Sequence, residues 1–86
     1  MTPAEALGAI RGLAGAYRVV ISSHAYQRMN QRGATFQDVH HALVHAQCCV
    51  WQAQKGTWKV ESADLDGDAL TLAVVIQDGV IVVTLF

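Results

Sequence analysis

The 86-residue sequence has little charge, few aromatic residues and a single proline. Charged residues make up 15% of the chain and the formal net charge is −1, so bulk electrostatics does not indicate a nucleic-acid-binding protein. No apolar run is long enough to span a membrane and no basic segment precedes one, so we expect neither a membrane anchor nor a signal peptide. Repeats, linkers and low-complexity segments are absent. The length fits one small domain over residues 1–86.

Cysteine is also scarce, since the chain has only Cys48 and Cys49. Adjacent cysteines rarely pair with each other, because their Cβ atoms do not converge well enough for an unstrained disulfide. Two free thiols predict a reducing compartment, and we therefore expect a cytoplasmic protein.

Apolar residues, by contrast, are abundant. They make up 52% of the chain and the mean hydropathy is +0.27, which is high for so small a domain. We expect a partner or a second copy of the chain to cover part of this apolar surface. Charge is distributed unevenly: residues 1–37 hold four arginines and one acid, a net +3, whereas residues 38–86 have a net −4. A basic first half favours a local anion site on a nearly neutral protein.

Capping residues predict the first helix. Thr2 is expected to cap it, Pro3 suits its first position, and Glu5 completes a capping box. The residues at helical spacing that we expect on its buried face are Leu7, Ile10, Leu13, Ala14 and Tyr17. Three glycines weaken this helix, and we expect them to allow close approach of another backbone; they are Gly8, Gly12 and Gly15. Residues 18–21 follow as a short strand rich in β-branched residues.

Two further helices are expected before residue 48. Ser22 or Ser23 can cap the first of them, and Gly33 can end it in the left-handed conformation. Thr35 and Asp38 form a second capping box. The residues of the third helix that we expect to face the core are Phe36, Val39, Leu43 and Ala46, whereas His41 and His45 should face solvent.

After residue 47 the pattern becomes that of strands, over residues 48–52, 57–63, 70–76 and 80–86. Turn residues separate them, including the segment 64–68 and the pair Asp78–Gly79. The last two strands are apolar on both faces, which is typical of strands that are covered on both sides. We therefore predict an α+β fold of two layers, in which helices pack on one face of an antiparallel sheet and the first helix is an extra element.

One stripe of the second helix combines a titratable group with two permanent cations. His24, Arg28 and Arg32 are spaced four residues apart, which places them within roughly 80° of arc on one helix face. Such a stripe suits cleavage of RNA by its own 2′-hydroxyl, which needs a proton acceptor, a proton donor and cations near the phosphoryl oxygens. The structural alternative is the solvated face of an amphipathic helix.

The segment from Ser22 to Gly33 resembles a family of small bacterial proteins with the signature Ser-x-His-Ala-x-x-Arg-x-x-x-Arg-Gly, followed by a helix and by strands ending near Val-Thr-Val-Tyr. That family is similar to the RelE/ParE-like toxins, which share a ribonuclease fold and also include gyrase inhibitors. The resemblance covers about residues 19–86. It implies metal-independent RNA cleavage by His24, Arg28 and Arg32, a further contribution from Thr84, and a cognate antitoxin on the apolar sheet. Phe86 stands where many relatives have Tyr.

Other residues are weaker candidates. Lys59 and Glu61 lie on the strand face opposite Trp58, where they could line the same groove as the helix stripe, with Glu61 as an alternative base; a solvated cross-strand pair is the structural alternative. Five soft donors fall within ten residues, namely His40, His41, His45, Cys48 and Cys49. Because the usual zinc spacings are absent, we predict no metal and no cofactor.

We therefore predict a bacterial toxin that acts as a ribonuclease, with catalytic residues His24, Arg28 and Arg32 and with Lys59, Glu61 and Thr84 binding the substrate. The alternative is a non-catalytic module that dimerises or binds another protein through its apolar sheet. A third interpretation is a metal-binding regulator that uses His41, His45 and a cysteine.

Overall fold

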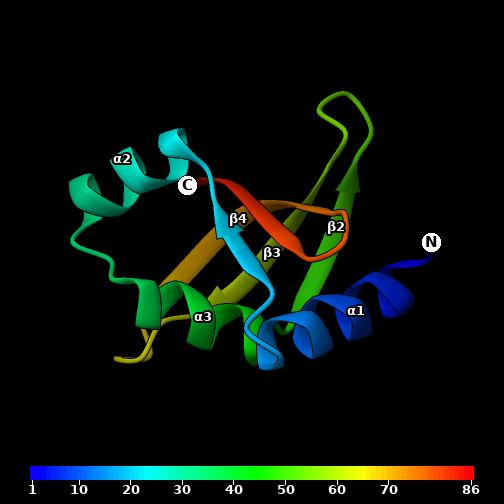
Figure 1. The fold of residues 1–86 in the computed structure, drawn as a ribbon, viewed down its shortest axis with the longest axis horizontal. Helices are drawn as coiled ribbons and strands as arrows, with labels where there is room; N and C mark the ends of the chain where they lie inside the picture. Colours follow the sequence, from blue (N-terminus) through cyan, green and yellow to red (C-terminus); the bar gives the residue numbers. More distant parts are fainter.

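The computed structural model describes all residues from Met1 to Phe86, as three helices and five strands (Figure 1). In chain order these are α1 (Pro3–Gly15), β1 (Val19–Ile21), α2 (Ser23–Arg32), α3 (Phe36–Val44), β2 (Cys48–Gln52), β3 (Thr57–Ala63), β4 (Ala69–Ile76) and β5 (Val80–Leu85). The predicted α+β class is confirmed. None of the helices has the length and apolar character needed to cross a membrane.

The five strands form one sheet in the order β1-β5-β4-β3-β2. The four strands after residue 47 pair antiparallel in sequence order, as predicted. The sheet as a whole is mixed, because β1 pairs in parallel with β5, with Val19 opposite Val80. The prediction of a wholly antiparallel sheet is therefore wrong at this edge. Two parallel strands need a long crossover connection between them, and the whole segment from α2 to β4 provides this connection between β1 and β5.

Both predicted capping boxes are present. The Thr2 hydroxyl accepts a hydrogen bond from the Glu5 backbone N–H (3.1 Å), and the Glu5 carboxylate accepts one from the Thr2 backbone N–H (2.8 Å). Thr35 and Asp38 make the same exchange at the start of α3. These bonds satisfy donors that a helix start leaves unpaired, which is why the two helices begin where the sequence predicts.

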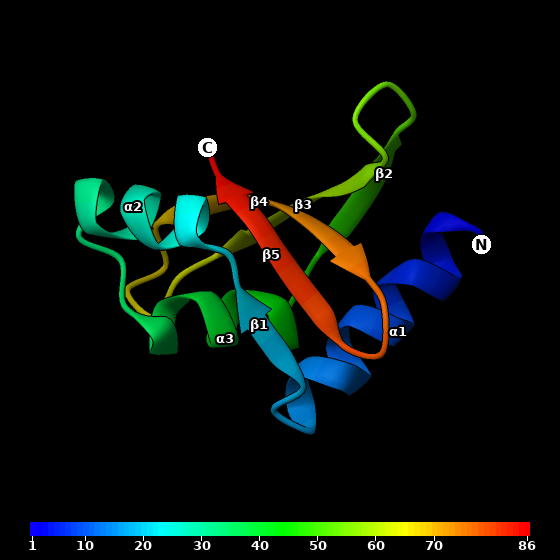
Figure 2. The same cartoon turned by 45° about the horizontal axis from the view of Figure 1, so that its top comes forward.

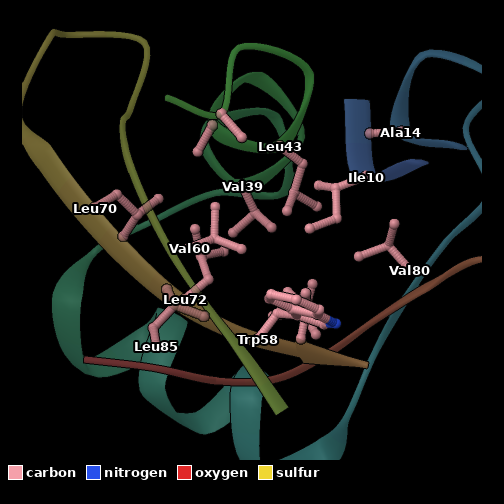
Figure 3. Packing of buried hydrophobic residues seen from close by; sticks show 14 of the residues in the cluster. Ile10, Ala14, Val39, Leu43, Trp58, Val60, Leu70, Leu72, Val80 and Leu85 are labelled. Carbon is pink, nitrogen blue, oxygen red and sulfur yellow. The ribbon is translucent and has the colours of Figure 1, made fainter. Parts of the chain in front are cut away.

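Helices α1 and α3 and one face of the sheet share a single buried cluster, part of which is labelled in Figure 3. Ile10 of α1 and Leu43 of α3 are fully buried there. Their partners on the sheet include Val60, Leu72 and Val82, which are also fully buried. We call this side of the sheet the inner face and the opposite side the outer face. Figure 2 shows β1 and β5 passing in front of α3.

Two expectations for α1 are wrong. Tyr17 does not face the core: α1 ends at Gly15, Tyr17 adopts a positive φ of 59°, and its side chain is 70% exposed. The glycines of α1 make no close backbone approach, since a Cβ at Gly8, Gly12 or Gly15 would have no neighbour within 4 Å. The close approach occurs instead at Gly79, where a Cβ would lie 2.9 Å from the Arg18 carbonyl oxygen.

Candidate functional site

Helix α2 is fixed to the end of β5 by its first residues. The Ser22 hydroxyl caps the helix by accepting a hydrogen bond from the Ala25 N–H (3.0 Å), and it donates to the Val83 carbonyl oxygen (2.8 Å). Ala25 and Met29 are buried on the side of α2 that faces the core. Gly33 ends the helix with φ 70°, as predicted. Figure 2 shows α2 beside the carboxyl end of β5.

The predicted stripe of α2 is present, but its members differ in their surroundings. Arg28 is half-buried, and its Nε donates a hydrogen bond to the Leu85 carbonyl oxygen (3.0 Å). One of its terminal nitrogens also donates to the Gln31 amide oxygen (3.4 Å). His24 and Arg32 are exposed one turn before and one turn after it. Arg28 therefore positions α2 on β5, whereas the other two side chains point to solvent.

The three predicted substrate-binding residues share the outer face. Lys59 of β3 and Thr84 of β5 flank the same residue of β4, Ala73, which stands opposite both of them. Glu61 follows Lys59 two residues later and pairs with Thr71. The Thr84 hydroxyl donates to the Leu85 carbonyl oxygen (3.2 Å), which is the same oxygen that Arg28 binds. Thr84 and Arg28 are therefore brought together at the end of β5.

Phe86 lies at the centre of a cationic group on the outer face. The Lys55 and Lys59 ammonium nitrogens are 5.6 and 5.7 Å from the centre of the Phe86 ring, within cation–π range. As a residue, Phe86 remains 42% exposed. We call Arg28, Lys55, Lys59, Thr84 and Phe86 the Phe86 cluster. It combines three basic side chains with an exposed aromatic residue, and such combinations are suited to binding phosphates and stacking on bases.

Sequence reasoning missed two members of this cluster. Lys55 was expected only as part of a turn, and Phe86 only as a residue that lacks a tyrosine hydroxyl. They are 31 positions apart in the chain, and the antiparallel pairing of β3, β4 and β5 brings them together. No local pattern carries this information, although the alternation that places Lys59 on the outer face is visible in the sequence.

Glu61 interacts with the edge strand β2. The Cys48 thiol donates to a Glu61 carboxylate oxygen (3.5 Å), and this bond raises the pKa of Cys48. Burial raises the pKa of Cys49, whose thiol donates to the Pro3 carbonyl oxygen (3.3 Å). Both cysteines are free, and raised pKa values disfavour the thiolate form. Neither thiol is suited to nucleophilic chemistry near neutral pH.

The three histidines of α3 play different parts. His40 packs its ring on Tyr17, with ring centres 4.3 Å apart, and its Nε2 lies 2.8 Å from the Ala14 carbonyl oxygen. It therefore connects α3 to α1. His41 is half-buried and His45 is exposed, and their ring centres are 4.5 Å apart. The expectation that both face solvent holds fully only for His45.

The acidic segment 64–68 forms the predicted turn. One Asp64 carboxylate oxygen accepts hydrogen bonds from the backbone N–H groups of Asp66 and Asp68, both at 2.9 Å. The three carboxylates lie within 4.8 Å of one another, and two of the three residues are exposed. Backbone donors already use Asp64, so the arrangement is explained by the turn itself.

The two tryptophans are packed against each other near the β2 edge. Trp58 is buried and Trp51 is 49% exposed, with ring centres 5.2 Å apart. Together with Met1 and Pro3 they line a hollow of about 320 Å³. None of the side chains that line it is acidic, basic or histidine. The Phe86 cluster and the α2 stripe remain the candidate site.

No family model, no curated protein and no solved structure matches this chain.

Proposed function

We propose that this protein is a RelE-like ribonuclease, the toxin of a toxin–antitoxin pair, which binds RNA at the Phe86 cluster and cleaves it beside the α2 stripe. The observation that carries the proposal is the position of Arg28. Its Nε is bound to the Leu85 carbonyl oxygen, next to Phe86, so the cationic face of α2 and the cations of the outer face adjoin. Basic side chains are thereby gathered at one location, although the net charge of the chain is −1.

The reaction is transesterification within RNA. A base removes the proton of a 2′-hydroxyl, the 2′-oxygen attacks the adjacent phosphorus, and the bond from phosphorus to the 5′-oxygen breaks. The leaving oxygen takes a proton, which yields a 2′,3′-cyclic phosphate and a 5′-hydroxyl. The step is internally balanced and consumes no co-reactant.

Each residue has a role that follows from its chemistry. His24 is exposed, and histidine is the side chain that most often serves as a general acid or base, so it accepts or donates the proton; Glu61 is the alternative base. Arg32 and the one guanidinium nitrogen of Arg28 that is not bound to Leu85 or Gln31 stabilise the charge that develops on the phosphoryl oxygens. Lys55 and Lys59 hold neighbouring phosphates, and the Phe86 ring stacks on a base.

The outer face also favours a protein partner, which we identify with the antitoxin. Val20 of β1, Ile81 of β5 and Val75 of β4 form one row across neighbouring strands, in which Val20 is 58% exposed and the other two are half-buried. Val50, which is 54% exposed, lies on β2 at the other edge of the sheet. Contiguous exposed apolar side chains are typical of binding surfaces. If the chain has no catalytic activity, this face supports the second candidate function, a module that dimerises or binds another protein through its sheet.

The direct test measures cleavage of single-stranded RNA by the purified protein and by His24→Ala. We expect the variant to lose about 100-fold or more in rate, because general acid–base groups contribute on that order. Gln27→Ala is the matched control, since Gln27 is an exposed neighbour on the same helix. It should cleave at the wild-type rate.

Circular dichroism and urea unfolding show whether each variant is folded. Phe86→Leu separates binding from chemistry: affinity for a non-cleavable 2′-O-methyl RNA should fall by about 1 kcal/mol or more, which is the worth of one stacked base. Equal cleavage by wild type, His24→Ala and Gln27→Ala would contradict the assignment of the active site.

A further inference from the structure

The last turn of α3 holds two histidine rings side by side, away from the residues used above. His45 caps the helix, and its backbone N–H still donates to the His41 carbonyl oxygen (3.0 Å), so the helical spacing persists through His45. The two ring centres are 4.5 Å apart and the planes are inclined by 46°. We propose that His41 and His45 together bind a divalent transition-metal ion of the zinc or nickel class.

The separation of the rings fits one shared ion. Zinc binds imidazole nitrogen at about 2.0–2.1 Å, which places two ligand nitrogens of one tetrahedral ion roughly 3.4 Å apart. Two rings with centres 4.5 Å apart reach this separation by small side-chain rotations. His45 is exposed and His41 is half-buried, so both can turn without disturbing the core.

The surroundings favour a cation at this position. The site lies at the carboxyl end of α3, where the helix dipole and the last carbonyl groups attract positive charge. Asp38 precedes His41 by one turn and adds a negative charge, although its oxygens are used by Thr35 and by the Leu65 N–H. Imidazole is a suitable ligand for zinc, copper, iron and nickel.

The neighbouring histidine serves as an internal comparison. His40 has its Nε2 at the Ala14 carbonyl oxygen and its ring stacked on Tyr17, so it is committed to packing. The only cluster of three or more acidic, histidine or cysteine ligand atoms is in the segment 64–68, so His41 and His45 have no third protein ligand. Water completes the coordination, and the bound ion links successive turns of α3 and stabilises its last turn.

The test is titration of ZnCl₂ into tag-free protein that has been dialysed against a chelator, followed by calorimetry. The Cys48→Ser background removes the exposed thiol, because cysteine is itself a zinc ligand and would complicate the titration. We expect one zinc ion per chain, and binding about tenfold weaker or more in His41→Ala and in His45→Ala, since loss of even an outer partner costs that much. His24→Ala, which removes an exposed histidine on another helix, should bind zinc as the background does.

Thermal unfolding gives a second readout. Zinc should raise the unfolding temperature of the background protein but not of the His41→Ala/His45→Ala double variant, because an ion bound only to the folded state stabilises it. No zinc uptake by the background protein, or equal uptake by the double variant, would overturn the proposal. Neither result bears on RNA cleavage, which is proposed to use other residues and no metal.

Discussion

The two faces of the sheet differ sharply although the same strands form them. On the inner face, Val60, Leu72 and Val82 are fully buried beneath the helices. On the outer face, Lys59 and Thr84 flank Ala73, and apolar side chains are left half-exposed. Alternation of side chains along a strand thus separates the residues that stabilise the fold from those that we assign to binding. Substitutions on one face should therefore leave the properties of the other unchanged.

The largest effect should come from matched valine substitutions on neighbouring strands. Val60 is fully buried on the inner face and Val50 is 54% exposed on the outer face. Val60→Ala should lower the free energy of unfolding by about 2–3 kcal/mol, through lost burial and a residual cavity. Val50→Ala should change it by only about 0.5 kcal/mol. Urea unfolding measures both, and similar losses would remove the distinction between the faces.

The second effect concerns the cations of the outer face. Lys55→Ala and Lys59→Ala should each weaken binding of a 2′-O-methyl RNA about tenfold. Each should also reduce the slope of the logarithm of the binding constant against the logarithm of the salt concentration by roughly 0.7, as expected for one lost phosphate contact. Stability should be unaffected. Arg18→Gln is the control: Arg18 is exposed and its guanidinium donates to the Asp78 carbonyl oxygen in the β4–β5 turn. If it weakened binding equally, RNA would be held by net charge and not by the Phe86 cluster.

The third effect tests two glycines with opposite surroundings. Gly12→Ala should stabilise the protein by about 0.5–1 kcal/mol, because the helix tolerates a Cβ that meets nothing within 4 Å. Gly79→Ala should destabilise it by at least that much, since Gly79 has φ 157° and the new Cβ would lie 2.9 Å from a carbonyl oxygen. Thermal or urea unfolding of both variants is the measurement. If Gly12→Ala destabilised the protein, this would indicate that another part of the backbone does approach α1 closely at Gly12.

The smallest effect is a loss of folding stability at low pH. The hydrogen bond from the Thr35 backbone N–H holds the pKa of Asp38 below its usual value, so folding favours the carboxylate. Its contribution is complete above the usual carboxyl pKa, about 4, and is lost as pH falls through the lower pKa of the folded state. The free energies of unfolding of the wild-type protein and of Asp38→Asn should therefore differ at pH 7 and become equal near pH 2. A constant difference would contradict this cause.

Local signals in the sequence were sufficient for much of the fold. The capping boxes, the left-handed Gly33 and the alternation of Trp58, Lys59 and Val60 each depend on a few neighbouring residues, and each is present. The parallel pairing of β1 was missed because a three-residue strand says nothing about its partner or direction. Tyr17 was misplaced because the helical pattern continues in the sequence beyond the residue where α1 ends.

The candidate site was predicted in part for the same reason. The stripe of α2 follows from spacing alone, whereas the hydrogen bond from Arg28 to Leu85 joins residues 57 positions apart. The grouping of Lys55 with Phe86 likewise depends on strand order. The resemblance to RelE-like toxins, and the activity that it implies, stay predictions.

The most direct test of the account is to identify the products that the purified protein makes from a defined single-stranded RNA in the presence of EDTA. We predict fragments that end in a 2′,3′-cyclic phosphate and begin with a 5′-hydroxyl, formed at the same rate with and without the chelator. We also predict growth arrest when the wild-type protein, but not His24→Ala, is expressed in bacteria. No cleavage and no arrest by the wild-type protein would contradict the ribonuclease proposal and leave the outer face as a protein-binding surface.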